Sequence, residues 1–175
     1  GSMYDGVLAT IANALAQQQV STIRFNFRGV GASDGISGRA TAAEKNQTQE
    51  ANRTLADTAP CEVADLAAVI LWLEQQLPQS KLWLAGYSFG AAVIWYWLQT
   101  ANHSNKAQQA LLIAPPTTAM ALPPNTLAAM PISIDIAWGD ADDYVDPASL
   151  QALSGVNLHT IAGANHFFLG RQSEL

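Results

Sequence analysis

The sequence is poor in cysteine, in basic residues and in long apolar runs. Cys61 is the only cysteine among 175 residues, so no disulfide can form within the chain. Lys and Arg number 8 against 14 Asp and Glu, giving a formal net charge of -6, which argues against nucleic acid as a partner. No apolar run reaches the roughly 20 residues that cross a bilayer, and no signal peptide is visible. We therefore expect a cytoplasmic protein with neither a nucleic-acid nor a membrane partner.

The composition and the length favour one globular domain. Hydrophobic residues make up 49% of the chain, which is typical of a domain with a packed core. We therefore expect a single domain over residues 1–175. Residues 37–59 are polar and form a long connection without a clear apolar pattern. Long connections are often functional, so we interpret this stretch as a polar insertion or a lid.

Segments with helical and strand periodicity alternate along the chain. We predict helices over residues 5–18, 62–77, 91–99 and 147–153, and strands over residues 22–27, 81–85, 110–114, 132–138 and 156–161. This alternation predicts an α/β protein with an open, mostly parallel sheet and helices on both faces. Loops that follow the strands then meet at the carboxyl edge of the sheet, where functional groups gather.

A G-x-S-x-G motif, Gly86-Tyr87-Ser88-Phe89-Gly90, stands between a predicted strand and a predicted helix. A serine on such a sharp turn is held in a strained backbone conformation with its hydroxyl exposed. The two glycines are expected to leave room for the strand and the helix. Ser88 is thus a candidate nucleophile. The structural alternative is a tight turn that carries a small polar residue.

A nucleophilic serine needs a base to accept its proton, and histidine is the usual base. His103 lies in a polar segment and His159 lies within a predicted strand, so we expect both to be surface or packing residues. His166 follows the last predicted strand in a loop that can reach the same edge as Ser88. His166 is therefore the candidate general base, against the alternative of a loop histidine bonded to backbone.

The acid that orients the base is expected in the loop after residues 132–138, which holds four aspartates. Asp146 precedes a proline and is well placed as a helix N-cap. Asp142 is the favoured partner of His166, with Asp140 and Asp143 as the alternatives. The chain order serine, aspartate, histidine is the order expected for this type of sheet.

Taken together, these motifs resemble those of α/β-hydrolases, and in particular small bacterial hydrolases near the dienelactone hydrolase branch. The resemblance is carried by residues 24–33, 86–90, 139–145 and 163–168. In the G-x-x-D-x-x-V pattern of such proteins the aspartate falls on Asp142. The resemblance implies hydrolysis of an ester, thioester or related acyl group, with no metal and no organic cofactor.

The resemblance also implies roles for individual residues. It implies a catalytic set of Ser88, Asp142 and His166, and an oxyanion hole of Phe89 and Met3. Tyr87 and Phe167, which adjoin the nucleophile and the base in the sequence, are candidates for the substrate pocket; the alternative for Phe167 is that it only anchors its loop. Arg28 is expected to be structural, through bonds to loop carbonyls, rather than a substrate clamp.

Such hydrolases usually have a further strand before the first helix, between the strands at residues 22–27 and 81–85. We therefore expect a fold that lacks the N-terminal strands. The sheet must then close directly, leave an edge exposed, or borrow a strand, which leaves a homodimer open. An alternative function follows as well: a truncated or degenerate scaffold that binds a ligand without turnover.

Overall fold

The computed structural model describes residues 2–37, 60–99, 107–122 and 132–175. Its helices are α1 (Gly6–Gln17), α4 (Pro60–Gln76), α5 (Phe89–Leu98), α6 (Pro147–Gln151) and the 3-10 helix η2 (Gln172–Glu174). Its strands are β1 (Leu82–Tyr87), β2 (Ala107–Ile113), β3 (Ser133–Gly139) and β4 (Asn157–Ile161). Eight of the nine segments predicted from the periodicity correspond to these elements.

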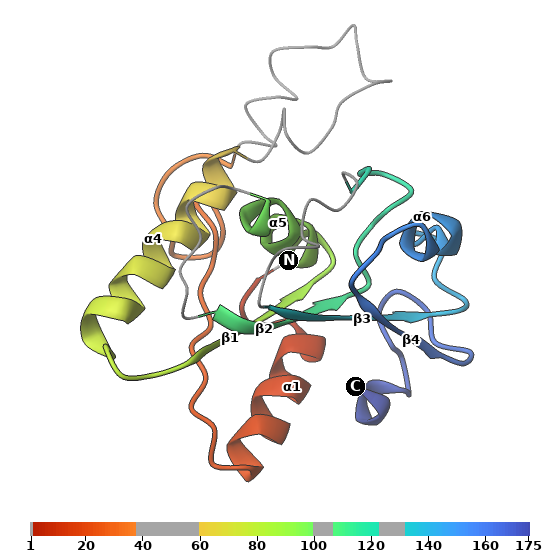
Figure 1. Cartoon of the computed structure of the whole chain (residues 1–175), viewed down its shortest axis with the longest axis horizontal. Helices are drawn as coiled ribbons and strands as arrows, with labels where there is room; N and C mark the ends of the chain where they lie inside the picture. The colour runs from red at the N-terminus through yellow and green to blue at the C-terminus, as the bar shows by residue number, and fades with distance from the viewer. Residues whose placement is uncertain (1, 38–59, 100–106, 123–131) are drawn as a thin grey trace, which may run out of the picture.

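The four strands form one parallel sheet in the order β1-β2-β3-β4. Figure 1 shows α4, α5 and α6 above the sheet, and α1 and η2 below it. Helices therefore cover both faces, as the alternation of strands and helices predicts. Because all strands run in one direction, β1, β2, β3 and β4 deliver their following loops to the same edge of the sheet.

The core lies between the central strands and α5. Leu112 and Ile113 of β2 and Ile136 of β3 are inaccessible to solvent. On α5, Trp95 and Leu98 are equally buried, because this helix packs on β1 and β2 and is covered by α4. A helix that is apolar on all sides is stable only in such a buried position. The position of α5 therefore fixes that of Ser88, the residue just before its first turn.

Side-chain caps define where two helices begin. Asp5 accepts a hydrogen bond from the N–H of Val7 at the start of α1. Asp146 accepts from the N–H groups of Ala148 and Ser149 at the start of α6. The predicted N-cap role of Asp146 is confirmed, and this cap ends the loop that carries the candidate acid.

The strand predicted over residues 22–27 is wrong. Within the described part of the chain this segment is extended but pairs with no strand, and β1 is an edge of the sheet. An alternating pattern specifies which faces are apolar, yet a strand also needs a neighbour for its backbone N–H and C=O groups. Here Phe27 packs edge-on against Phe89, with ring centroids 5.9 Å apart. Among the described residues, β1 therefore has no strand partner on this side of the sheet.

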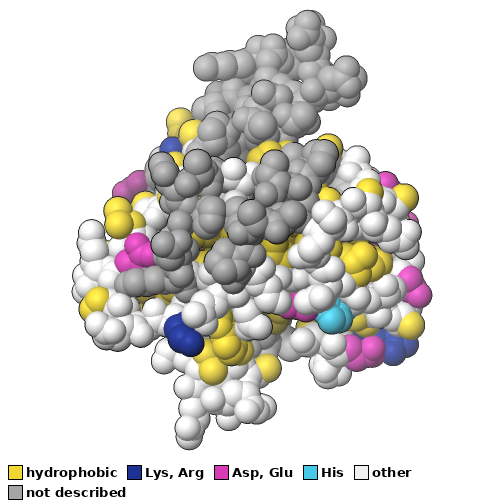
Figure 2. Space-filling model, in the orientation of Figure 1, with side chains coloured by type: hydrophobic (Ala, Val, Ile, Leu, Met, Phe, Trp, Pro, Cys, Tyr) yellow, Lys and Arg dark blue, Asp and Glu magenta, His cyan; other side chains and the backbone are white. Residues whose placement is uncertain are grey.

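The remaining expectations concern the surface and the segments outside the described residues. The polar insertion at residues 37–59, apart from Ser37, and His103 both lie outside them. Among the helices that are described, none has the length and apolar character to span a bilayer. On the face drawn in Figure 2, the visible Lys and Arg side chains are few and lie apart from one another. This distribution agrees with the small number of basic residues in the sequence.

Candidate active site

Ser88 stands on the turn between β1 and α5 in a strained conformation. Its φ of 53° and ψ of -116° lie in a backbone region that is disfavoured for every residue except glycine. The turn is held by the Ser88 N–H, which donates to the carbonyl of Ile113 at 2.8 Å. The buried helix α5 on one side and the hydrogen bond to β2 on the other therefore hold this backbone in place.

The two glycines of the motif differ in their roles. A Cβ on Gly86 would lie 2.6 Å from the carbonyl atoms of Gly90, so only glycine fits there. A Cβ on Gly90 would meet no described atom within 4 Å outside its own helix. The expectation that both positions exclude a side chain is thus correct for Gly86 and wrong for Gly90.

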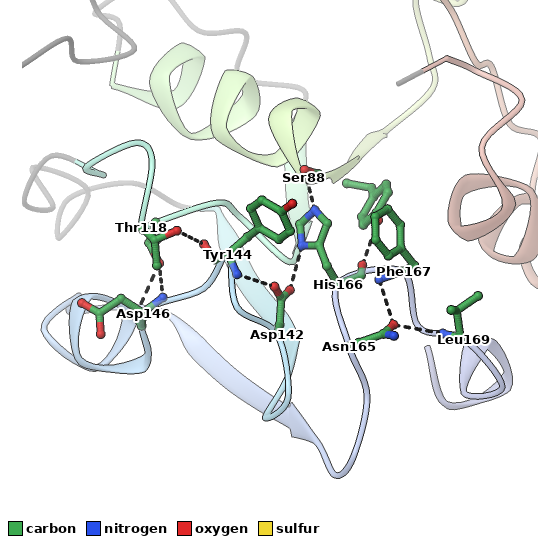
Figure 3. A network of polar contacts seen from close by, with 11 residues as sticks. Ser88, Thr118, Asp142, Tyr144, Asp146, Asn165, His166, Phe167 and Leu169 are labelled. Carbon is green, nitrogen blue, oxygen red and sulfur yellow. Dashed lines mark hydrogen bonds and ion pairs between the residues drawn. The ribbon is translucent and has the colours of Figure 1, made fainter. Parts of the chain in front are cut away.

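Ser88, His166 and Asp142 lie in hydrogen-bonding contact, as Figure 3 shows. The Nε2 atom of His166 is 2.9 Å from the Ser88 Oγ, and its Nδ1 atom is 2.8 Å from Asp142 Oδ2. His166 is 8% exposed and Asp142 is 7% exposed. A carboxylate can only accept, so the proton belongs on Nδ1, which leaves Nε2 to accept from the serine hydroxyl.

The loops after β3 and β4 must lie close together for Asp142 to contact His166, and Gly139 permits this close approach. A Cβ on Gly139 would stand 2.0 Å from the carbonyl oxygen of Ala164. The same carbonyl accepts a hydrogen bond from the Ala141 N–H at 3.1 Å. The acid loop after β3 is therefore in direct backbone contact with the histidine loop after β4, which sets the distance between Asp142 and His166.

A further hydrogen bond fixes the second oxygen of the acid. Asp142 Oδ1 accepts from the N–H of Tyr144 at 2.8 Å. The carbonyl of Tyr144 in turn accepts from the N–H and the hydroxyl of Thr118, at 3.1 and 3.0 Å. Nearby, the Thr117 hydroxyl accepts from the N–H of Asp146 at 2.7 Å. The loop after β2 thus holds the acid loop in place (Figure 3).

The four aspartates of this loop have separate environments. Asp142 alone among them contacts the imidazole. Asp140 accepts from the N–H of Gly163 at 2.6 Å, Asp146 caps α6, and Asp143 is exposed. The structure therefore brings the favoured aspartate to His166 and leaves the two alternatives, Asp140 and Asp143, away from it.

The histidine loop is held from both sides of His166. The side chain of Asn165 accepts from the N–H groups of Phe167 and Leu169, at 3.1 and 3.3 Å. The hydroxyl of Tyr87 donates to the carbonyl of His166 at 2.8 Å. Burial raises the pKa of Tyr87, and the charges of nearby carboxylates add to the effect, so the phenol keeps its proton. Tyr87 therefore supports the histidine loop.

Two of the predicted site residues stand at the exposed surface or at the helix end. Phe167 is 56% exposed and its ring lies against the His166 imidazole. Phe89 is the first residue of α5, so its N–H belongs to the positive end of a buried helix. These positions fit a pocket wall and an oxyanion donor, and both roles stay predictions.

Met3 is placed differently from the expectation. Its N–H donates to the side-chain oxygen of Asn26 at 2.7 Å. A contribution of Met3 to an oxyanion hole would require exchange of this hydrogen bond for one to the substrate. The bond instead ties the first described residues to the segment at residues 21–27.

The residues expected to be structural have structural partners. The guanidinium of Arg28 binds the carboxylate of Asp65 on α4 through several short contacts, the shortest at 2.5 Å. Burial tends to raise the pKa of Asp65, but its hydrogen bonds from Arg28 and the charge of that residue outweigh this and lower it. His159 lies on β4, 2.8 Å from Asp135. Arg28 is thus a clamp between a loop and a helix, with a carboxylate rather than carbonyls as its partner.

The comparisons with known proteins concern the family and the fold of the chain. The model of the α/β-hydrolase fold family matches residues 3–132. This chain belongs to the α/β-hydrolase fold family. A solved α/β serine hydrolase homologue from Coxiella burnetii is 32% identical, with a TM-score of 0.76, over 99% of this chain and 74% of the other. A solved α/β serine hydrolase from Xanthomonas campestris, described as lacking a lid, is 29% identical with a TM-score of 0.72 over 99% and 70%.

An uncharacterized protein of Rickettsia prowazekii, RP471, is 29% identical over 99% of this α/β-hydrolase and 69% of its own length. The fold and the family are those of hydrolases. The finer resemblance to the dienelactone hydrolase branch stays a prediction. The described residues contain no group of three or more His, Cys, Asp or Glu that could hold a metal ion.

Three residues that support the site were missed in the sequence. Tyr144 acts through its backbone N–H and carbonyl. Thr118 donates its hydroxyl, and Asn165 accepts through its side-chain oxygen. Only Asn165 could have been recognised in the sequence, because an asparagine side chain in a turn often accepts from the backbone N–H two residues later. The pairing of Thr118 with Tyr144 depends on two loops that are remote in sequence, so periodicity could not reveal it.

Proposed function

We propose that this α/β-hydrolase is a serine hydrolase that cleaves a carboxylic ester or thioester through an acyl-enzyme. The observation that carries the proposal is the hydrogen-bonded series Ser88–His166–Asp142. A nucleophile, a base and an orienting acid in this order are the elements of acyl transfer. The serine hydrolase homologues from Coxiella and Xanthomonas, similar over nearly the whole chain, support the same class of chemistry.

In the proposed reaction, the Ser88 Oγ attacks the carbonyl carbon while His166 Nε2 takes the hydroxyl proton. The electron pair of the carbonyl moves to oxygen, where the Phe89 N–H and the N-terminal end of α5 stabilise the negative charge. The intermediate collapses, the bond to the leaving group breaks, and His166 returns its proton to the leaving oxygen or sulfur. A water molecule, deprotonated by His166, then attacks the acyl-enzyme. The bond to Ser88 Oγ breaks, His166 returns the proton to that oxygen, and the carboxylic acid product leaves. Asp142 keeps the imidazole oriented throughout.

The proposed substrate is a small acyl ester or thioester, and the proposed chemistry requires no metal or organic cofactor. A homodimer is compatible with the proposal, because β1 is the terminal strand of the described sheet. A binding scaffold without turnover is the competing function.

Ser88→Ala tests the proposal with p-nitrophenyl acetate as substrate. We expect kcat/KM to fall by about 10⁴-fold or more, because loss of the nucleophile leaves only the effects of binding. The matched control is Ser173→Ala on η2, an exposed serine below the sheet, which should leave the rate unchanged. A fluorophosphonate probe should label Ser88 in the wild type. Folded protein that neither hydrolyses the ester nor reacts with the probe would favour the scaffold.

A further inference from the structure

Three aromatic rings surround the imidazole of His166. Tyr87 has its ring centroid 5.4 Å away and is turned inward by its bond to the His166 carbonyl. Tyr144 lies 4.7 Å away with its plane tilted by 48°, and Phe167 lies 5.5 Å away at 85°. In Figure 3 the imidazole stands between Tyr144 and Phe167. Tyr144 and Phe167 are 50% and 56% exposed, so each ring contacts the base and also faces solvent.

The loops that carry these two rings are fixed by their backbone. Tyr144 donates from its N–H to Asp142, and its carbonyl accepts twice from Thr118. Phe167 donates from its N–H to the side chain of Asn165. The rings are therefore positioned in advance of any ligand, although half of each remains accessible. An accessible ring on a fixed backbone contributes little burial to folding but can contact a ligand at a low cost in conformational entropy.

The proposed reaction determines which part of an ester would reach these rings. The acyl carbon bonds to Ser88 Oγ, and its oxygen turns toward the N-terminus of α5. The leaving oxygen must come within hydrogen-bonding distance of His166 Nε2, because it receives its proton there. The substituent on the leaving oxygen therefore extends along the imidazole, toward Tyr144 and Phe167.

We propose that Tyr144 and Phe167 form a subsite for the alcohol part of the ester, and that this subsite prefers an aromatic alcohol. The inference rests on the proposed serine hydrolase function and adds the substrate class. Aromatic rings gain from edge-to-face and offset contacts with one another beyond the effect of buried area. The exposed parts of the Tyr144 and Phe167 rings are available for such contacts with a flat substituent.

The test compares two acetate esters that differ in the ring of their alcohol. Benzyl acetate and cyclohexylmethyl acetate have leaving groups of similar size and basicity, but only the first is aromatic. We expect kcat/KM to be about threefold to tenfold higher for benzyl acetate. Methyl phenylacetate and methyl cyclohexylacetate place the same two rings on the acyl side, where we expect a ratio close to one.

Variants assign the preference to the rings. Tyr144→Leu and Phe167→Leu should each bring the alcohol-side ratio toward one, while the backbone bonds of both loops remain available. Tyr144→Phe keeps the ring and should keep the ratio. Trp83→Leu is the matched control, because Trp83 is 57% exposed but lies near the start of β1, at the opposite end of that strand from Ser88. Trp83→Leu should change kcat/KM for neither of the two alcohol-side esters.

The outcomes separate this inference from the proposed function. Ser88-dependent hydrolysis of both alcohol-side esters with equal kcat/KM, or a preference that both leucine variants retain, would overturn the aromatic subsite alone. A preference confined to the acyl-side pair would overturn it too. Failure of every ester, together with no fluorophosphonate labelling of Ser88, would overturn the proposed function and the subsite with it.

Discussion

The loops that follow β3 and β4 carry Asp142 and His166 and are joined to each other by backbone hydrogen bonds. The segment at residues 21–27, by contrast, is held by side chains. Ala141 bonds to the carbonyl of Ala164, and Asp140 bonds through its N–H to that of Ile161. At the other end, residues 21–27 pair with no described strand and depend on contacts such as Asn26 with Met3.

This difference indicates where the site obtains its precision. The backbone contacts at β3 and β4 set the positions of Asp142 and His166, the proposed acid and base. The buried helix α5 sets the position of Ser88, the proposed nucleophile. The segment at residues 21–28 contributes the Phe27 ring packed on Phe89 and the Arg28 clamp to α4. We therefore expect substitutions in the first region to change activity, and substitutions in the second region to change mainly stability.

Among substitutions that compare these two regions, the largest effect should come from Asp142→Asn. The amide cannot hold the imidazole in the tautomer that leaves Nε2 free, so we expect kcat to fall by about 10⁴-fold with little change in KM. Asp143→Asn changes the neighbouring exposed carboxylate and should leave kcat unchanged. Steady-state kinetics with p-nitrophenyl acetate measures both. Equal losses in the two variants would contradict the assignment of the acid.

The same glycine-to-alanine change at two positions should have opposite results. Gly139→Ala places a Cβ against the carbonyl of Ala164, so we expect a loss of about 3 kcal/mol or more in the free energy of unfolding, and a lower kcat. Gly90→Ala adds a methyl group in open space on α5 and should stabilise by about 0.5–1 kcal/mol. Urea unfolding gives both values. A tolerated Gly139→Ala would show that the two loops do not need this close contact.

Asn26→Ala tests the weaker region. Loss of the hydrogen bond from the Met3 N–H should cost about 1 kcal/mol of stability, with kcat/KM changed by less than about tenfold. Asn157→Ala on β4 removes an exposed hydrogen bond to Asp135 on β3 and should cost less. If Asn26→Ala instead lowered kcat/KM about 10²-fold or more, the loss expected for an oxyanion-hole donor, the comparison drawn above would fail.

The smallest effect concerns the Arg28–Asp65 clamp and its dependence on pH. The pKa of Asp65 is lower in the folded protein than its ordinary value of 3.8. The carboxylate therefore stabilises the fold above about pH 3.8, and this contribution is lost as the pH falls from there through the folded pKa. We expect the Tm of Asp65→Asn to lie below that of the wild type at pH 7 and the two to converge as the pH falls. A constant difference down to pH 2 would contradict this.

The sequence predicts the paired part of the fold and the three residues that meet at the candidate site, but not the residues that support them. The Ser88 motif, the four-aspartate loop and His166 follow strands whose periodicity is readable, and all four described strands correspond to predicted ones. The segment at residues 22–27 has a strand pattern, yet pairing depends on a neighbour that the pattern cannot supply. The bonds of Thr118 to Tyr144 and of Tyr87 to the His166 carbonyl join segments that are remote in sequence, so a local pattern cannot reveal them.

The central claim is that Ser88 carries the acyl group during turnover. Rapid acid quench of the reaction with p-nitrophenyl acetate, followed by peptide mass spectrometry, tests it most directly. The account predicts one acetyl group on the peptide that contains Ser88 in the wild type, and none in Ser88→Ala. Hydrolysis of the ester without acetylation of Ser88, or with the acetyl group on another residue, would contradict it.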